Sequence, residues 1–177
     1  MLSPKRPLSG SISARLFTSA RFVSNKTANG RTEHLMRHIM VATDGSSGAN
    51  RAVAIAAELA KALAADLLVV TVADSQLGEE ARQLARVEGN IGDVLEALTT
   101  RTLHEAEAHA RRLGASRIEL RTGSGDVAQS LIDIAASNSI EMIVLGRRGR
   151  GQLAGLLLGS VSQKLASLAP CTVVVVP

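Results

Sequence analysis

The sequence predicts an α/β protein: a single doubly wound, Rossmann-like domain with a five-stranded parallel sheet and helices on both faces. Short apolar runs of strand character alternate with longer segments in which apolar residues recur every three or four positions. The resulting order, β-α-β-α-β-α-β-α-β, requires right-handed crossovers and strands that run parallel. Most of the strand runs are also nearly free of polar residues, as expected for strands that are buried on both faces.

The expected strands span 38–43, 67–73, 117–121, 142–145 and 171–176, and the expected helices span 49–65, 92–113, 126–138 and 160–168. Ser46 or Ser47 can cap the first helix, Ser124 can cap the third, and Gly114 fits the end of the second. The strand 117–121 alternates in polarity, which indicates a sheet edge. Segment 75–92 is polar and weakly patterned, so we expect a loop with a short helix there.

The composition excludes several classes of partner. Phe17 and Phe22 are the only aromatic residues of the Phe, Tyr or Trp type, so residues 34–177 have an aliphatic core and no stacking platform for nucleic acid. No apolar run approaches the ~20 residues that a membrane-spanning helix needs. The single cysteine, Cys171, is typical of a reducing compartment, which favours the cytoplasm. We therefore expect neither nucleic acid nor a membrane as a partner.

The N-terminal tail accounts for the net charge of +4. Residues 1–33 hold six basic side chains and one acidic side chain, so residues 34–177 keep 14 of the 20 basic and 15 of the 16 acidic residues. The tail is explained by a start assigned too far upstream, by a mitochondrial transit peptide or by a disordered extension, and the Ala and Arg content favours the first. We expect a disordered basic tail at 1–35 and a domain at 36–177, with mitochondrial localisation as the alternative to cytoplasmic.

A glycine pattern follows the strand 142–145. Gly146, Gly149, Gly159 and Ser160 form Gly-x2-Gly-x9-Gly-Ser between a strand and a helix. This arrangement suits phosphate, because glycines let backbone N–H groups approach closely and helix N-termini attract anions. The loop has no lysine matching GxxxxGK[ST], and the first strand is followed by DGSSG instead of GxGxxG. Both a P-loop NTPase and a Rossmann dinucleotide site are therefore disfavoured.

The glycine pattern resembles the ATP-binding signature of the universal stress protein family, and the resemblance extends from about residue 38 to the end of the chain. It implies the strand order 3-2-1-4-5, counted along the chain, with the ligand between the first and fourth strands. It also implies ATP with Mg2+ as the ligand, an unidentified protein partner, and a homodimer through the last strand, Thr172–Val176. Four consecutive valines on an exposed edge would otherwise invite uncontrolled pairing, and proline at Val174 should disrupt the dimer.

The resemblance also assigns roles to individual residues. Asp44, at the end of the first strand, is expected to accept hydrogen bonds from a ribose or base, although it could also cap the following turn. Ala42, Thr43 and Val72 fall where the family places backbone near the base. The glycine loop and the last helix supply phosphate donors, and the arginines of the loop add positive charge. The complete expected set is Ala42, Thr43, Asp44, Val72, Gly146, Arg147, Gly149, Gly159, Ser160, Val161 and Ser162.

No catalytic set is evident in the sequence. Neither a Ser-His-acid nor a Cys-His arrangement is visible, and His104 and His109 are five residues apart, which does not match the i, i+4 spacing of a helical metal pair. We therefore expect an ATP-binding regulator that acts in the stress response through nucleotide-dependent conformation or partner binding, without efficient catalysis. The alternative is a slow ATPase or an autophosphorylating phosphotransferase on the same fold.

Overall fold

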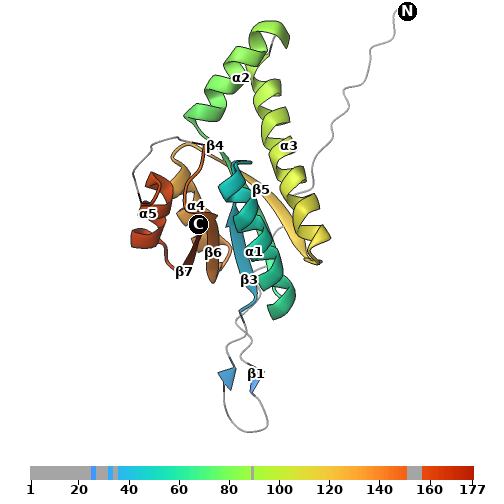
Figure 1. Cartoon of the computed structure of the whole chain (residues 1–177). Coiled ribbons are helices and arrows are strands. Elements are labelled where there is room, and N and C mark those ends of the chain that lie inside the picture. Colours follow the sequence, from blue (N-terminus) through green and yellow to red (C-terminus); the bar gives the residue numbers. More distant parts are fainter. Residues whose placement is uncertain (1–24, 27–31, 34–35, 89, 151–156) are drawn as a thin grey trace, which may run out of the picture.

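The computed structural model describes residues 25–26, 32–33, 36–88, 90–150 and 157–177, and its body is a five-stranded parallel sheet (Figure 1). The strands lie in the order β5-β4-β3-β6-β7, which is 3-2-1-4-5 when these five are counted along the chain, so the expected topology is confirmed. Their bounds are β3 (His38–Ala42), β4 (Asp66–Ala73), β5 (Ile118–Ser124), β6 (Met142–Gly146) and β7 (Thr172–Val176).

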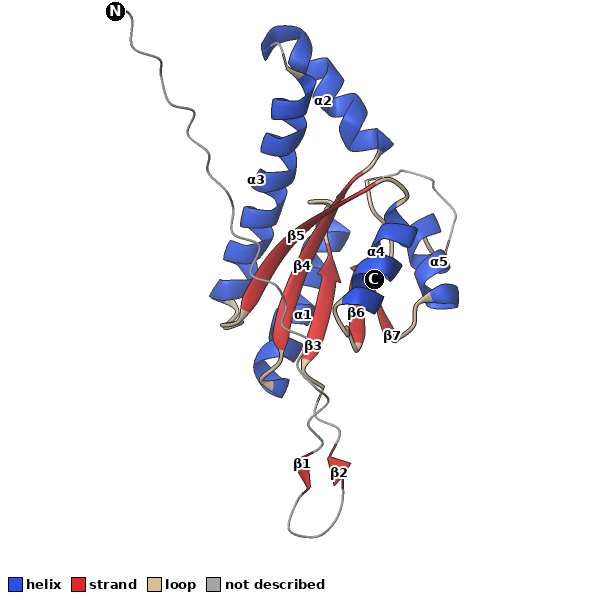
Figure 2. Cartoon of the chain, turned by 180° about the vertical axis from the view of Figure 1, so that it is seen from behind, coloured by secondary structure: helices blue, strands red, loops and turns tan. Residues whose placement is uncertain are grey.

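Helices cover both faces of the sheet (Figure 2). α1 and α3 pack on one face, and α4 and α5 pack on the other. Alternate residues of each strand feed the two layers: Ile39 and Val41 face α1, while Met40 belongs to the cluster on the α4 side. The helices are α1 (Ser47–Leu63), α2 (Ser75–Glu88), α3 (Ile91–Arg112), α4 (Val127–Ser137) and α5 (Ser160–Leu168).

Small side chains let α1 approach the sheet closely. Ala52, Ala56 and Ala57 are completely buried against the strands. Leu63 and Ala64 are exposed, because the helix ends there. Ala64 adopts the left-handed conformation, with φ of 50°, and its N–H caps the last turn.

Segment 75–92 differs from the expected loop. It contains the 14-residue helix α2, which forms a hairpin with α3 that projects beyond the sheet (Figure 1). Among the side chains of α2 that the structure describes, Leu77 and Ala81 are buried, against Val94 and Leu98 of α3. The apolar stripe of α2 is therefore narrow, because it packs mainly on one neighbouring helix, α3. The apolar periodicity of this segment in the sequence is weak for the same reason.

The N-terminus of α4 is capped by Asp126, whose carboxylate accepts the Gln129 N–H at 2.8 Å. The expected cap, Ser124, is the last residue of β5 and pairs with Ala73 of β4. The strand is longer than the predicted 117–121 because its backbone bonds continue along β4 beyond the residues that the polarity pattern marks.

Within the tail, β1 (Asn25–Lys26) and β2 (Thr32–Glu33) form a small antiparallel pair that is separate from the main sheet. The rest of the tail, on which the expectation of disorder falls, lies outside the described residues. In the described part of the chain, no helix is long and apolar enough to cross a membrane.

The close approach of α1 can be tested by enlarging one side chain. Ala56→Leu should lower the free energy of unfolding by about 1–3 kcal/mol, because the fully buried site has no room for the larger side chain. Ile55→Leu is the matched control: Ile55 is 37% exposed, and its substitution should change stability by about 0.5 kcal/mol or less. Urea denaturation measures both variants, and equal stability of the two would contradict this account of α1.

Candidate functional site

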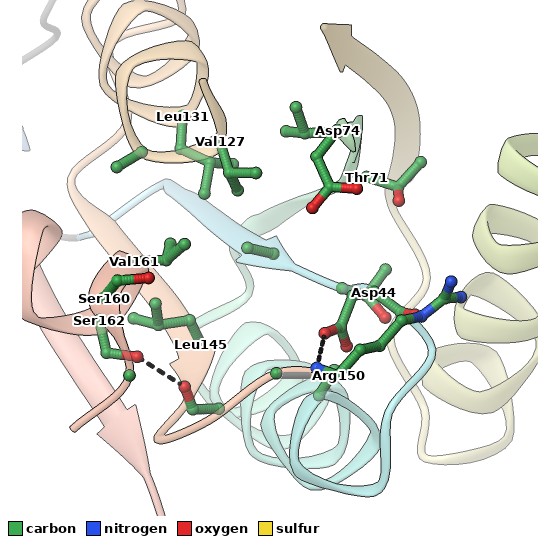
Figure 3. A pocket seen from close by; sticks show the side chains of 18 of the residues that line it. Asp44, Thr71, Asp74, Val127, Leu131, Leu145, Arg150, Ser160, Val161 and Ser162 are labelled. Atoms are coloured by element: carbon green, nitrogen blue, oxygen red, sulfur yellow. Dashed lines mark hydrogen bonds between the residues drawn. The ribbon is translucent and has the colours of Figure 1, made fainter. Parts of the chain in front are cut away.

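A cavity of about 830 Å³ opens at the C-terminal ends of β3, β4 and β6 (Figure 3). This is where the strand order reverses, the place at which doubly wound folds bind ligands. Its volume lies within the range of small-molecule sites. Figure 3 shows a polar side, formed by Asp44, Thr71, Asp74 and Arg150, and an opposite side on which the labelled aliphatic side chains lie together with Ser160 and Ser162. The labelled aliphatic residues are Val127, Leu131, Leu145 and Val161, and the labelled polar residues around the cavity are Asp44, Thr71, Asp74, Arg150, Ser160 and Ser162.

Every residue that the sequence assigns to the site lines this cavity except Arg147. The Arg147 backbone instead holds the two ends of the glycine loop together. Its N–H donates to the Val176 carbonyl at 2.6 Å, and its carbonyl accepts from the Gly159 N–H at 2.9 Å. These backbone bonds bridge the end of β7 and the start of α5. The role expected for the Arg147 side chain at phosphate stays a prediction.

Asp44 connects the turn after β3 to the glycine loop. One carboxylate oxygen accepts the Ser46 N–H at 2.9 Å, and the other accepts the Arg150 N–H at 2.8 Å. The Nε of Arg150 also donates to the Asp44 carbonyl, at 2.6 Å. The turn role and the cavity position expected for Asp44 therefore coexist. Each oxygen keeps further acceptor capacity, so the two bonds fix the orientation of the carboxylate without exhausting it.

Two glycines of the signature are needed by packing alone. A Cβ on Gly149 would lie 2.5 Å from Oδ2 of Asp44, and a Cβ on Gly146 would lie 2.8 Å from the backbone carbonyl carbon of Gly48 in α1. Both distances are shorter than real Cβ contacts. The path of the loop against α1 therefore requires glycine at 146, whereas a side chain at 149 would have to displace the Asp44 carboxylate.

The N-terminus of α5 lines the cavity and has no side-chain cap, since its N-cap residue is Gly159. Side chains of Ser46, Asn90 and Asp126 cap α1, α3 and α4. The first N–H groups of α5 have no acceptor within the helix, so the positive end of the helix dipole lies at the cavity.

Ser162, in the first turn of α5, holds the glycine loop. Its hydroxyl donates to the Gly146 carbonyl at 2.9 Å (Figure 3) and lies 3.1 Å from the Arg147 carbonyl. Ser160 lies exposed at the start of the helix. The phosphate roles expected for the two hydroxyls stay predictions.

Two cationic side chains that line the cavity, Lys164 and Arg150, have acidic partners. The Lys164 ammonium lies 3.2 Å from Asp126, and the Arg150 guanidinium lies 2.9 Å from Glu80. The Gln129 N–H, and then Lys164, hold the pKa of Asp126 below its ordinary value. The described residues contain no cluster of three or more His, Cys, Asp or Glu side chains suited to a metal ion.

Sequence reasoning missed several residues of the cavity wall. Asp74 directly follows β4, much as Asp44 follows β3 after one intervening residue. This repeated pattern of a strand followed by an aspartate could have indicated Asp74. The glycine-rich turn before Asp126 was a second signal. Val127 and Leu131 gave none, because an apolar residue that faces a cavity has the same helical spacing as one that faces the core.

Comparison with known proteins agrees with this geometry. The model of the universal stress protein family matches residues 36–177. The chain belongs to the universal stress protein family. A universal stress protein of Thermus aquaticus is 34% identical over 149 residues, which cover 80% of this chain and 99% of the relative.

Solved structures of universal stress proteins have the same fold. One that was determined in complex with cAMP is 29% identical, has a TM-score of 0.62, and is matched over 80% of this chain and 97% of its own. Another, from Archaeoglobus fulgidus in complex with dAMP, has a TM-score of 0.59 over 81% of this chain and 99% of its own. At 22% identity, the second supports the fold alone.

The packing role of the signature predicts a stability effect that needs no ligand. Gly149→Ala should lower the free energy of unfolding by about 1–3 kcal/mol, because the new methyl group displaces a carboxylate that two backbone N–H groups hold. In Gly78→Ala, the control within α2, the added methyl group meets open space and should stabilise by up to about 1 kcal/mol. Thermal unfolding without nucleotide measures both, and an unchanged Gly149→Ala would exclude the packing role.

Proposed function

We propose that this protein binds ATP in the cavity at the ends of β3, β4 and β6, and that it acts in the stress response through nucleotide-dependent conformation or partner binding. The observation that carries the proposal is the uncapped N-terminus of α5 beside Gly149 in a cavity of nucleotide size. A neutral ligand gains little from the positive end of a helix dipole, whereas a phosphate is stabilised by its charge and can accept hydrogen bonds from several of the free N–H groups at once.

The rest of the cavity suits a nucleoside. Val72, Val127, Leu131 and Leu145 form an aliphatic wall that can hold a purine ring, and Asp44 on the polar side can accept hydrogen bonds from ribose hydroxyls. Mg2+ is usually held by one or two carboxylates together with substrate phosphates, and Asp44 is a carboxylate in a suitable place. The metal would then arrive with the phosphates, consistent with the lack of a preformed cluster among the described residues.

A cyclic nucleotide is the second candidate ligand. The relative solved with cAMP is 29% identical to this chain, so its ligand is a specific alternative to ATP. The two candidates share the purine and ribose and differ in phosphate charge, which makes them separable in one binding experiment.

Ser160→Asp tests the phosphate site without harming the fold. A carboxylate at the first position of α5 interacts favourably with the helix dipole, so the melting temperature without ligand should hold or rise. The same charge repels phosphate. ATP at 100 times its dissociation constant should stabilise the wild-type protein by about 2.7 kcal/mol, and the variant should lose most of that shift.

Ser160→Asn is the matched control, since asparagine has nearly the same shape as aspartate but carries no charge. Differential scanning fluorimetry of the full chain with Mg-ATP, cAMP and adenosine compares the three proteins. A wild-type protein that no nucleotide stabilises at millimolar concentration would reject the proposed function. A shift with cAMP and none with ATP would favour the second candidate.

We also propose a homodimer through the outer edge of β7. In the described sheet β7 pairs with β6 on one side only. The Thr172 N–H donates to Glu141, and the Val176 carbonyl accepts from Arg147, so these residues turn their backbone groups inward. Because the direction alternates along a strand, Val174 also faces β6, while Val173 and Val175 present their N–H and C=O groups outward. Proline at Val174 would therefore disrupt the backbone hydrogen bonds between β7 and β6 and would leave the outer edge of β7 unchanged.

The dimer is tested by proline at an outward position. Val175→Pro removes an N–H from the outer edge and should give a folded monomer, because an edge strand tolerates proline where its N–H faces away from the sheet. Val174→Pro removes a bond to β6 and should destabilise the fold. Light scattering after size exclusion, with circular dichroism, distinguishes the two. A dimer that persists in Val175→Pro would exclude pairing through this edge.

A further inference from the structure

Arg150 links three parts of the fold. Its backbone N–H and its Nε hold Asp44, in the turn after β3, at 2.8 and 2.6 Å. Its Nη1 donates to Oε2 of Glu80, in α2, at 2.9 Å. One side chain of the glycine loop therefore connects the cavity to the helical hairpin that projects beyond the sheet.

The first residues of α2 form part of the cavity wall. Asp74 and Leu77 line the cavity, and the Asp74 carboxylate caps the helix by accepting the Leu77 N–H at 2.9 Å. Beyond this point α2 packs on α3 through a narrow apolar contact. The position of α2 relative to the cavity thus depends on that contact and on the link between Glu80 and Arg150.

The guanidinium of Arg150 points away from Ser160 and Ser162 (Figure 3). Arg150 nevertheless directly follows Gly149, which lines the cavity. A phosphate held by the Gly149 N–H would be next to Arg150 along the chain, and arginine binds phosphate with strong, charge-assisted, often bidentate hydrogen bonds. The Glu80 carboxylate carries a single negative charge, so it competes less well for the Arg150 guanidinium than a nucleotide phosphate group that carries more charge.

We propose that Glu80 competes with nucleotide phosphates for Arg150, so that phosphate binding breaks the Glu80–Arg150 pair and frees α2. This regulation rests on the proposed function of the same site. The side chains of Arg150 and Glu80 are 33% and 42% exposed, so the pair is the kind of surface ion pair that adds little stability and exchanges readily. Glu80 then makes the affinity for a ligand depend on the charge of its phosphates. The release of α2 changes the surface of the protein when such a ligand binds.

The test compares Glu80→Gln with Glu79→Gln by calorimetric titration of the full chain. Glu79 lies one residue away on α2 and pairs with Arg82 of the same helix at 2.7 Å, so its variant removes an equal charge without touching Arg150. Glu80→Gln should bind Mg-ATP about fivefold more tightly than the wild type, the scale of a surface ion pair. Adenosine, which has no phosphate, should bind all three proteins equally, and Glu79→Gln should match the wild type with both ligands.

A double-mutant cycle shows whether Glu80 acts through Arg150. Arg150→Gln should weaken ATP binding, and adding Glu80→Gln to it should have no further effect, because the competed group is gone. Amide hydrogen exchange gives an independent readout: ATP should increase exchange in α2 of the wild type, adenosine should not, and Glu80→Gln without ligand should show the same modest increase that ATP causes in the wild type.

The outcomes separate this inference from the proposed function. ATP binding by the wild type with unchanged or weaker affinity in Glu80→Gln overturns the competition and leaves the nucleotide site standing. Equal tightening in Glu79→Gln also overturns it, since the effect would then be a general change in charge. A wild-type protein that binds neither ATP nor adenosine overturns both the competition and the proposed function.

Discussion

The close backbone approach between α1 and the end of β6 is the constraint on which the site depends. Gly146 lies so near Gly48 that neither side chain nor solvent fits between them. This contact starts the glycine loop against α1, and Gly149 then passes within contact distance of the Asp44 carboxylate. The two neighbouring strands that flank the topological switch are thereby joined through their loops as well as through the sheet.

The same glycines thus serve the fold and the proposed phosphate site. Because Gly146 has no side chain, the loop can pack on α1. Because the N-cap residue of α5 is Gly159, no side chain caps the N–H groups of that helix at the cavity. Arg147 and Ser162 hold the beginning of the loop to the beginning of α5 through backbone carbonyls. A phosphate site of this kind needs few charged side chains, because helix-terminal N–H groups arrive already oriented and lose no side-chain entropy on binding.

The aliphatic core explains why the sheet can be so thinly covered. With alanine filling the α1 face, helix and sheet are separated by small side chains, and the inner strands β3, β4 and β6 are buried on both faces without any aromatic residue. α2 is the exception, since its described apolar side chains pack on α3 and touch the sheet only near the end of β4, at Ala73. An element with so little buried surface is the part of the described fold that can move at low cost, and it borders the cavity.

The sequence by itself determined the fold class, the positions of the five main strands and the glycine signature, because strand runs, helical spacing and glycine spacing are local patterns. The strand order came from the family resemblance and was confirmed. Only the tertiary structure decided which side chains serve the ligand cavity. The Ser162 hydroxyl has the right chemistry for phosphate but donates to the loop, and Arg147 lies outside the cavity lining, where its backbone bonds to β7 and Gly159. Val127, Leu131 and Glu80 gain their places through the packing of distant segments, which residue type does not encode.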